Sequence, residues 1–278
     1  MLANLVNGEA ESSIPVTDRA FHYGDGVFET LRVASGEMTL WPQHRERLLA
    51  GCDFLGIPLL PEKLDNDLQR LLAGSPDEGI VKILVSRGSG GRGYQPRGVG
   101  APLRVVQFYS LPDNARQFTE QGIEATVCRH PVSGNSRMSR FKHLCRLDQV
   151  LASQELGERF PEGVMLSDDG YIIEGTRSNL FLAVAGELAT PSLEKAGVQG
   201  VMRQYLLERF AAAGLPVRID RIDSKDLLDA SELFFCNSVF GVWPVKSLVH
   251  QQGTACYPHD NFTRMAREFA DDAFATAD

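Results

Sequence analysis

The chain has 278 residues, of which 43% are hydrophobic and 23% charged, and its formal net charge is −8. This length accommodates one large or two ordinary domains, and the composition is typical of a globular protein and excludes a disordered or collagen-like chain. The chain contains no run of about 18 apolar residues, the length needed to span a bilayer. Its acidic net charge provides no overall basic field, so we expect neither a membrane nor a nucleic acid as partner.

The first 110 residues predict a small N-terminal α/β domain (1–110). Residues 2–6 and 12–17 are typical of strands, and Asn7-Gly8 between them favours a type I′ hairpin turn. Apolar residues at the spacing of strands and helices predict further elements, with strands at 27–34, 80–86 and 104–110 and helices at 42–55 and 61–73. A glycine-rich loop, RGSGGRGYQPRGVGAP, separates the last two strands.

Residues 111–121 include Pro112 and few strongly apolar residues, so we place an interdomain linker there. A larger C-terminal domain (122–278) follows. Its predicted strands span 123–129, 163–167, 170–174, 179–184, 217–221 and 232–236. Its predicted helices span 143–158, 201–213, 224–230 and 259–274. The helix at 143–158 is expected to bury one apolar face, made of Leu144, Leu147, Val150 and Leu151. Because strands outnumber helices, we predict an α+β fold with mixed and mostly antiparallel sheets and packed helices.

The cysteines are scattered along the chain and form no C-x-x-C pair. They are Cys52, Cys128, Cys145, Cys236 and Cys256. An odd number at these spacings fits neither a disulfide framework nor a zinc site. We therefore expect reduced thiols, a cytoplasmic protein and no metal site.

Lys142 differs from the other five lysines in its surroundings. It stands where an irregular polar stretch gives way to an apolar-faced segment, between Phe141 and Leu144. An amine held partly out of water at such a place is activated as a nucleophile towards a carbonyl group. Position alone leaves an ordinary interfacial lysine as the alternative.

Three further features are typical of a binding site, and two of them, the loop arginines and the helix start, point to an anionic ligand. Arg87 and Arg92 lie in the glycine-rich loop, and arginine matches carboxylates with two parallel hydrogen bonds, although a solvent-exposed hairpin is the alternative. Glu174 closes a strand beside small polar residues. Residues 197–203 open a helix with glycines, whose first N–H groups could seat an anion or simply form a turn and cap.

Six motifs occur in order along the whole chain: DRAFHYGDGVFETLR at 18–32, HRERL at 44–48, FKHLCRL at 141–147, EGTRSNLF at 174–181, GVQGVMR at 197–203 and CNSV at 236–239. Together they resemble the fold type IV family of pyridoxal 5′-phosphate (PLP) enzymes. That family includes branched-chain aminotransferases, D-amino acid aminotransferases and aminodeoxychorismate lyases.

The resemblance implies a two-domain fold with a C-terminal PLP-binding domain, PLP as cofactor and a homodimer. It implies that Lys142 is the catalytic lysine that bonds to the cofactor and that Glu174 contacts the pyridine nitrogen. Thr30 is implied as a substrate contact. The implied phosphate contacts are Arg47, Val201, Met202, Ser238 and Val239.

Within the family, RGSGGRGY at 87–94 and KHLCRL at 142–147 are most similar to the aminodeoxychorismate lyases. Cys145 stands where those enzymes usually have asparagine, and Leu147 where branched-chain aminotransferases have tyrosine. The resemblance implies conversion of 4-amino-4-deoxychorismate to 4-aminobenzoate and pyruvate in folate biosynthesis. This substrate is a small dicarboxylate, which suits contacts from Arg87 and Arg92. A D-amino acid or branched-chain aminotransferase of the same fold is the alternative.

Overall fold

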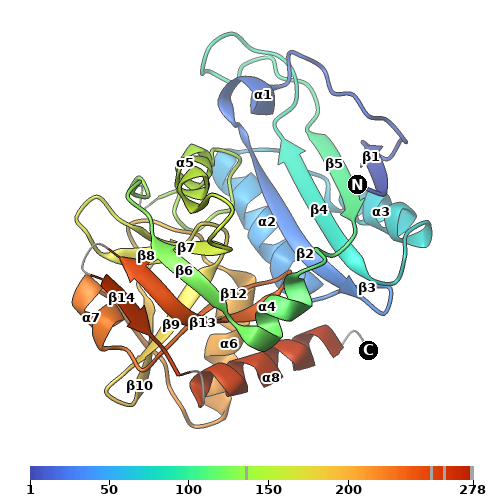
Figure 1. The fold of residues 1–278 in the computed structure, drawn as a ribbon. Coiled ribbons are helices and arrows are strands. Elements are labelled where there is room, and N and C mark those ends of the chain that lie inside the picture. Colours follow the sequence, from blue (N-terminus) through green and yellow to red (C-terminus); the bar gives the residue numbers. More distant parts are fainter. Residues whose placement is uncertain (135–136, 251–252, 259–260, 276–278) are drawn as a thin grey trace. The chain divides into compact units, whose positions relative to one another are not determined.

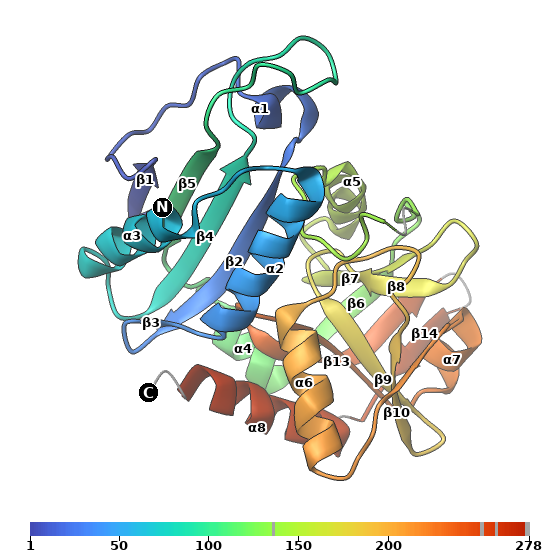
Figure 2. The ribbon, with the colours of Figure 1, turned by 180° about the vertical axis from the view of Figure 1, so that it is seen from behind.

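The computed structural model describes residues 1–134, 137–250, 253–258 and 261–275. The chain divides into two compact units (Figures 1 and 2). Unit 1 comprises Met1–Pro112, Phe141–Cys145 and Phe274–Asp278, and unit 2 comprises Asp113–Arg140 and Arg146–Ala273.

Unit 1 is built on a five-stranded sheet of order β1-β5-β4-β2-β3, in which every pair of neighbours is antiparallel. Its strands are β1 (Ala3–Val6), β2 (Gly26–Ala34), β3 (Glu37–Met38), β4 (Gly79–Ser86) and β5 (Leu103–Tyr109). Its helices are α1 (Arg19–Tyr23), α2 (Trp41–Leu55) and α3 (Pro61–Ala73). Helices α2 and α3 lie across one face of the sheet (Figure 2).

The two faces of this sheet differ in character because side chains alternate along a strand. Leu31, Val81 and Ile83 point towards the helices and are fully buried with Leu48 of α2. The opposite face, which α2 and α3 do not cover, carries the half-buried Phe28 and its neighbours on alternate positions. We call it the Phe28 face.

The N-terminal hairpin turn is confirmed. Asn7 and Gly8 both have positive φ, 50° and 85°, and Val6 and Glu9 exchange backbone hydrogen bonds of 2.8 and 3.0 Å. The strand predicted at 12–17 is wrong, because exposed residues there pair with no other strand.

Unit 2 contains a mixed nine-stranded sheet of order β11-β10-β9-β12-β13-β6-β7-β8, with β14 paired to β13. Three pairs are parallel and the others antiparallel. The strands are β6 (Ile123–Val127), β7 (Glu162–Leu166), β8 (Ile172–Gly175), β9 (Asn179–Val184), β10 (Glu187–Pro191), β11 (Arg218–Asp220), β12 (Glu232–Asn237), β13 (Gly241–His250) and β14 (Gly253–Cys256). The remaining helices are α4 (Ala115–Gln121), α5 (Leu147–Leu156), α6 (Val201–Ala212), α7 (Ser224–Asp229) and α8 (Phe262–Ala275). No helix of the described chain is long and apolar enough to cross a membrane.

Several predicted elements of the C-terminal half differ from the structure. Residues 115–121 of the expected linker form α4, and β10 and β13 were not predicted. Helix α5 begins at Leu147, and it buries Ala152 and Leu156 instead of the expected apolar face. Leu147, Val150 and Leu151 are 75%, 49% and 43% exposed. Residues 259–260, at the start of the predicted C-terminal helix, lie outside the described residues.

Candidate functional site

Lys142 lies on an extended segment that pairs with the start of β2. The N–H of Phe28 donates to the Lys142 carbonyl at 2.8 Å, and the N–H of Leu144 donates to the Gly26 carbonyl at 3.0 Å. A Cβ on Gly26 would lie 2.8 Å from Cδ1 of Leu144 and 2.3 Å from the carbonyl oxygen of Val85 on β4, so glycine permits the close approach of both segments. These hydrogen bonds to a strand explain why the predicted helix does not start at residue 143. The Lys142 Nζ lies 4.5 Å from the centroid of the Phe28 ring.

Glu29 places a carboxylate on the helix-facing side of β2, where its side chain is 1% exposed. The Arg47 Nε donates to Oε1 at 2.8 Å, and Nη2 donates to Oε2 at 2.5 Å. Nδ1 of His44 lies 2.7 Å from the same Oε2. His44 and Arg47 reach one carboxylate because residues three apart share a face of α2. The predicted phosphate arginine is therefore held by a bidentate ion pair.

The protonation states of this cluster follow from burial and neighbouring charge. Burial opposes ionisation of Glu29, but the charge of Arg47 and the hydrogen bond from His44 outweigh it and lower the pKa of Glu29 to about 2. Burial lowers the pKa of His44, against the opposite effect of Glu29, and the charges of Arg47 and Lys142 lower it further. At neutral pH Glu29 is therefore ionised and His44 neutral, and the Nδ1–H of His44 donates a hydrogen bond to the Glu29 carboxylate. The Nε2 of His44 is buried without a hydrogen-bond partner among the described residues.

Thr30, the predicted substrate contact, is half-buried on the Phe28 face. Its cross-strand partner on β4 is Lys82, whose own partner on β5 is Gln107. The Lys82 Nζ lies 5.9 Å from the Phe28 ring centroid. The ring of Phe28 therefore has two amines near it, from Lys82 and from Lys142.

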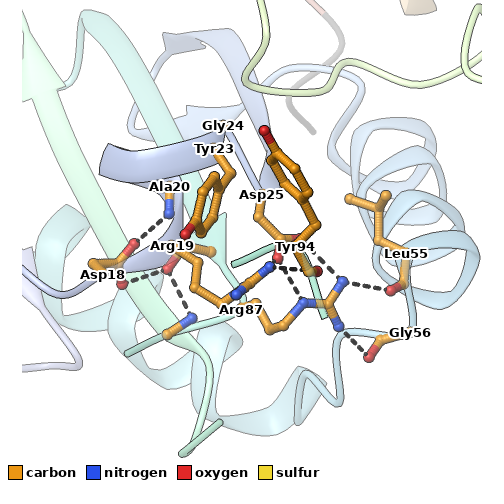
Figure 3. Close-up of polar contacts among 12 residues, drawn as sticks. Asp18, Arg19, Ala20, Tyr23, Gly24, Asp25, Leu55, Gly56, Arg87 and Tyr94 are labelled. Carbon is orange, nitrogen blue, oxygen red and sulfur yellow. Dashed lines mark hydrogen bonds and ion pairs between the residues drawn. The ribbon is translucent and has the colours of Figure 1, made fainter. Parts of the chain in front are cut away.

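Arg87, predicted to bind substrate, is held inside unit 1 (Figure 3). Its Nε and Nη2 donate to the two carboxylate oxygens of Asp25 at 2.8 and 3.0 Å. Its Nη1 and Nη2 also donate to the carbonyls of Gly56 and Leu55 at 2.9 and 2.7 Å. These bonds use four of the five guanidinium donors, and the side chain is 12% exposed. Arg87 thus ties the start of the glycine-rich loop to the end of α2.

A second arginine tethers the tip of the same loop. Arg19 Nε donates to Asp25 at 2.7 Å, and its Nη1 and Nη2 donate to the carbonyls of Gly93 and Tyr94 at 3.1 and 3.0 Å (Figure 3). Burial raises the pKa of Asp25, but the hydrogen bonds and charges of Arg87 and Arg19 together lower it below its ordinary value. Arg92, in contrast, is exposed and forms no ion pair with any described residue. Of the two predicted loop arginines, Arg92 is the one available to a ligand.

In unit 2, Glu174 lies near the end of β8, and its carboxylate accepts hydrogen bonds from Val198 and Gln149. The N–H of Val198 donates to Oε2 at 2.7 Å, and the Nε2 of Gln149 on α5 donates to Oε1 at 3.2 Å. Glu174 is only 4% exposed. Gly197, just before Val198, has φ +90°, and a Cβ there would lie 3.2 Å from Oε2. The backbone turn at Gly197 therefore brings an N–H group onto the glutamate.

The turn that follows Glu174 is built around the buried carboxylate of Glu162. Its Oε1 accepts hydrogen bonds from the N–H of Gly163 at 3.0 Å and of Thr176 at 2.8 Å. Its Oε2 accepts the hydroxyl of Ser178 at 3.0 Å. Glu162 thereby holds the turn between β8 and β9, and with it the end of β8 that carries Glu174.

Helix α6 begins at Val201 after Gly200, without a side-chain N-cap and without an acidic residue in its first turn. Val201 and Met202, predicted phosphate contacts, are 6% and 1% exposed. Asn179 of the neighbouring strand fixes the preceding loop by donating to the Val198 carbonyl at 2.9 Å. A helix start of this kind presents N–H groups and a positive dipole end to an anion.

The predicted contacts Ser238 and Val239 follow β12. Ser238 is 7% exposed. The N–H of Val239 donates to Oδ1 of Asn237 at 2.9 Å, so a phosphate contact through this group would require that bond to be shared or exchanged.

Glu29, His44, Gln149 and Glu162 were not singled out by the sequence. Glu29 had a detectable signal, since a charged residue at an inward position of an alternating apolar strand requires a buried partner. The sequence contains no comparable signal for Gln149 and Glu162. Gln149 contacts Glu174, 25 residues away along the chain, and Glu162 contacts Thr176, 14 residues away.

The amino-transferase class IV family model matches residues 26–248. An aminodeoxychorismate lyase from Vibrio harveyi is 35% identical over 260 residues, which cover 93% of this chain and 96% of that protein. The crystal structure of 4-amino-4-deoxychorismate lyase from Pseudomonas aeruginosa aligns with a TM-score of 0.90 and 37% identity, covering 97% of this chain and 98% of that one. The PLP-bound form of a hypothetical aminotransferase from Mycobacterium tuberculosis shares the fold, with a TM-score of 0.83, 22% identity and 99% of each chain covered.

Proposed function

Because the chain belongs to the amino-transferase class IV family, we propose that it is a PLP-dependent carbon–oxygen lyase. It converts 4-amino-4-deoxychorismate to 4-aminobenzoate and pyruvate. The observation that carries this proposal is the similarity to two lyases at 35% and 37% identity over nearly the whole chain. The net reaction removes the hydrogen from the ring carbon that bears the amine and expels the enolpyruvyl group as pyruvate, which leaves an aromatic ring.

The side chains and amides described above fit PLP in charge and in kind. Arg47 supplies a cation that Glu29 has already oriented, and the uncapped start of α6 supplies N–H groups for a phosphate. Glu174 supplies a buried carboxylate for the pyridine nitrogen, and Lys142 supplies a primary amine for the aldehyde. When bound, PLP withdraws electrons from the substrate carbon that carries the amine.

Each residue then has a defined task. Lys142 would hold the cofactor through its Nζ amine, and the same amine would take the proton from the amine-bearing ring carbon of the substrate. Glu174, which accepts hydrogen bonds from Val198 and Gln149, would face the pyridine nitrogen with its negative charge. Arg47, Val201, Met202, Ser238 and Val239 would hold the phosphate.

The substrate contacts proposed on unit 1 are Thr30 and the exposed Arg92. Arg87 is proposed to act on substrate through the loop that it anchors, because its own donors are occupied. A glycine-rich loop tethered at its base and tip can present one arginine to a carboxylate without moving as a whole.

The alternative is a D-amino acid or branched-chain aminotransferase of the same fold. The two activities differ in what an amino acid does to the holoenzyme. An aminotransferase given an amino acid alone converts its cofactor to the amine form, whereas the lyase does not. A change in the visible spectrum after addition of D-alanine or L-leucine would favour the alternative.

We also propose a homodimer in the cytoplasm that serves folate biosynthesis. The family resemblance supports the dimer. All five cysteines are free thiols, which supports a reducing compartment.

The proposed activity is tested by incubating the purified holoenzyme with 4-amino-4-deoxychorismate and measuring pyruvate and 4-aminobenzoate. Equal amounts of both products are expected, and neither should form with Lys142→Ala. Borohydride reduction followed by peptide mapping should place the cofactor on Lys142 alone. A cofactor found on Lys82 or Lys246 would refute the assignment of the lysine, and absence of both products from the wild type would refute the lyase.

A further inference from the structure

The Phe28 face of unit 1 carries a second amine, that of Lys82, to which the roles above assign no task. Lys82 stands directly across from Thr30 in the β2–β4 pairing. It is half-buried, and its Nζ lies 5.9 Å from the centroid of the same Phe28 ring that Lys142 approaches at 4.5 Å. Lys82 therefore lies near both Lys142, the proposed catalytic lysine, and Thr30, the proposed substrate contact.

The charge of Lys82 has no counter-charge among the residues of unit 1 that the structure describes. Most arginines of this unit are paired with a carboxylate, as are Arg19, Arg32, Arg45, Arg47, Arg70, Arg87 and Arg104. Lys82 forms no ion pair with any residue that the structure describes, and its contact with the Phe28 ring leaves its net charge in place. A half-buried ammonium in this condition is stabilised when an anion binds beside it.

The substrate of the proposed reaction has an anion in a suitable position. Its amine and its ring carboxylate are attached to opposite ends of a six-membered ring. When the substrate's amine lies at Lys142, the carboxylate at the opposite end of the ring lies away from Lys142, and Lys82 provides the other amine near Phe28. We propose that Lys82 binds the ring carboxylate of the substrate and so makes the site selective for ring acids. This inference rests on the proposed function.

Binding of product analogues tests the proposal without turnover. The holoenzyme is titrated by calorimetry with 4-aminobenzoate and with 4-aminobenzamide, which has the same shape and no charge. The wild type should bind the acid about tenfold or more tightly than the amide, the scale of one charged contact. Lys82→Gln should bind the two alike, and Lys82→Arg should retain the preference for the acid. A Lys82→Gln variant with the wild-type preference would overturn the proposal.

Kinetics separate this role from a purely structural one. Lys82→Gln should raise KM for 4-amino-4-deoxychorismate about tenfold or more with a smaller change in kcat, since the lost contact serves binding. Borohydride labelling of Lys142 should be unchanged. Lys63→Gln, which removes an exposed lysine from α3 of the same unit, is the matched control and should behave as wild type. A wild type that releases no pyruvate would refute the lyase, whereas the acid–amide comparison still decides the role of Lys82.

Discussion

The buried carboxylate of Glu29 fixes the orientation of the Arg47 guanidinium. Both carboxylate oxygens of Glu29 accept from the guanidinium, and His44 completes the set through Nδ1. Because the cluster is assembled within unit 1, the arginine is positioned before any anion arrives. A preoriented cation spends less conformational entropy when it binds a phosphate than a free one does.

Replacement of Glu29 by Gln should remove the negative charge that faces the largely buried guanidinium of Arg47. We expect the free energy of unfolding at pH 7 to fall by about 3 kcal/mol or more. The pKa of Glu29 is lowered from its ordinary 4.5 to about 2, so the stability that its charge contributes is present above pH 4.5 and disappears towards pH 2. Urea unfolding at several pH values should therefore show the two proteins converging as pH falls over this window.

The matched control for Glu29 is Glu78→Gln. Glu78 pairs with Arg32 at 3.3 Å and is 56% exposed, so its loss should cost no more than about 1 kcal/mol. A difference in the free energy of unfolding between wild type and Glu29→Gln that does not change with pH would contradict the ionised state assigned to Glu29.

Glu174→Gln should retain the cofactor but turn over slowly. Glutamine keeps an acceptor for the Val198 N–H but removes the negative charge that would hold the pyridine proton. We expect kcat to fall about 100-fold or more, which corresponds to about 2.7 kcal/mol in the barrier. Steady-state kinetics with a cofactor-content assay measures this, and Glu187→Gln, at an exposed residue of β10, is the control. Full activity in Glu174→Gln would place the partner of the ring nitrogen elsewhere.

At the scale of elements, the glycine-rich loop between β4 and β5 is held by two arginines that share Asp25. Arg87 links the loop to the end of α2, and Arg19 links its tip to α1 (Figure 3). The anchoring arginine and the exposed Arg92 should therefore respond differently to removal.

Arg87→Ala should lower the free energy of unfolding by about 1–3 kcal/mol, because a buried carboxylate loses one of its two partners. Arg92→Ala should change stability by less than about 0.5 kcal/mol, since the side chain is exposed. The Arg92→Ala variant should nevertheless have a lower kcat/KM, by a factor that corresponds to about 2–4 kcal/mol of transition-state stabilisation, because Arg92 is proposed to bind a substrate carboxylate in a desolvated site. Urea unfolding and steady-state kinetics on both variants test this contrast. Wild-type kcat/KM in Arg92→Ala would remove the loop from the list of substrate contacts.

At the scale of the whole molecule, each unit has its own core. Unit 1 packs β2, β4 and β5 against α2 and α3. In the described part of unit 2, the apolar clusters include a large one and a smaller one that contains Ala152 and Leu156 of α5. The expected linker at 111–121 is largely taken up by α4, and residues 141–145 return to unit 1 through their pairing with β2. Lys142, the proposed catalytic lysine, thus belongs to the first unit although it lies within the second half of the chain.

The proposed homodimer predicts a mass in solution of twice the chain's 30.6 kDa. Sedimentation velocity over a range of protein concentrations measures it directly. A single species at the monomer mass at every concentration would contradict the proposal.

Much of the fold could be predicted because the responsible patterns are local. Leucines at helical spacing predicted α3, which buries Leu64, Leu68 and Leu71, and Asn7-Gly8 predicted the first turn. The same reasoning failed at Leu147 and Leu151, since an apolar side chain at helical spacing does not specify what it packs against. The strand β13 was missed, although it pairs with its chain neighbours β12 and β14 and with β6, which is distant in the sequence.

By itself the sequence determined the fold class, the family and the segments that carry Lys142, Arg47 and Glu174, because each lies in a short contiguous motif. Only the tertiary structure decided which groups hold these side chains: Glu29 for Arg47, Val198 and Gln149 for Glu174, and Phe28 beside Lys142. It also assigned Arg87 to the protein's own Asp25 and placed Lys82 across from Thr30. The reason is physical: propensity and periodicity act over a few residues, whereas cross-strand pairing and burial join groups that only the folded chain brings together.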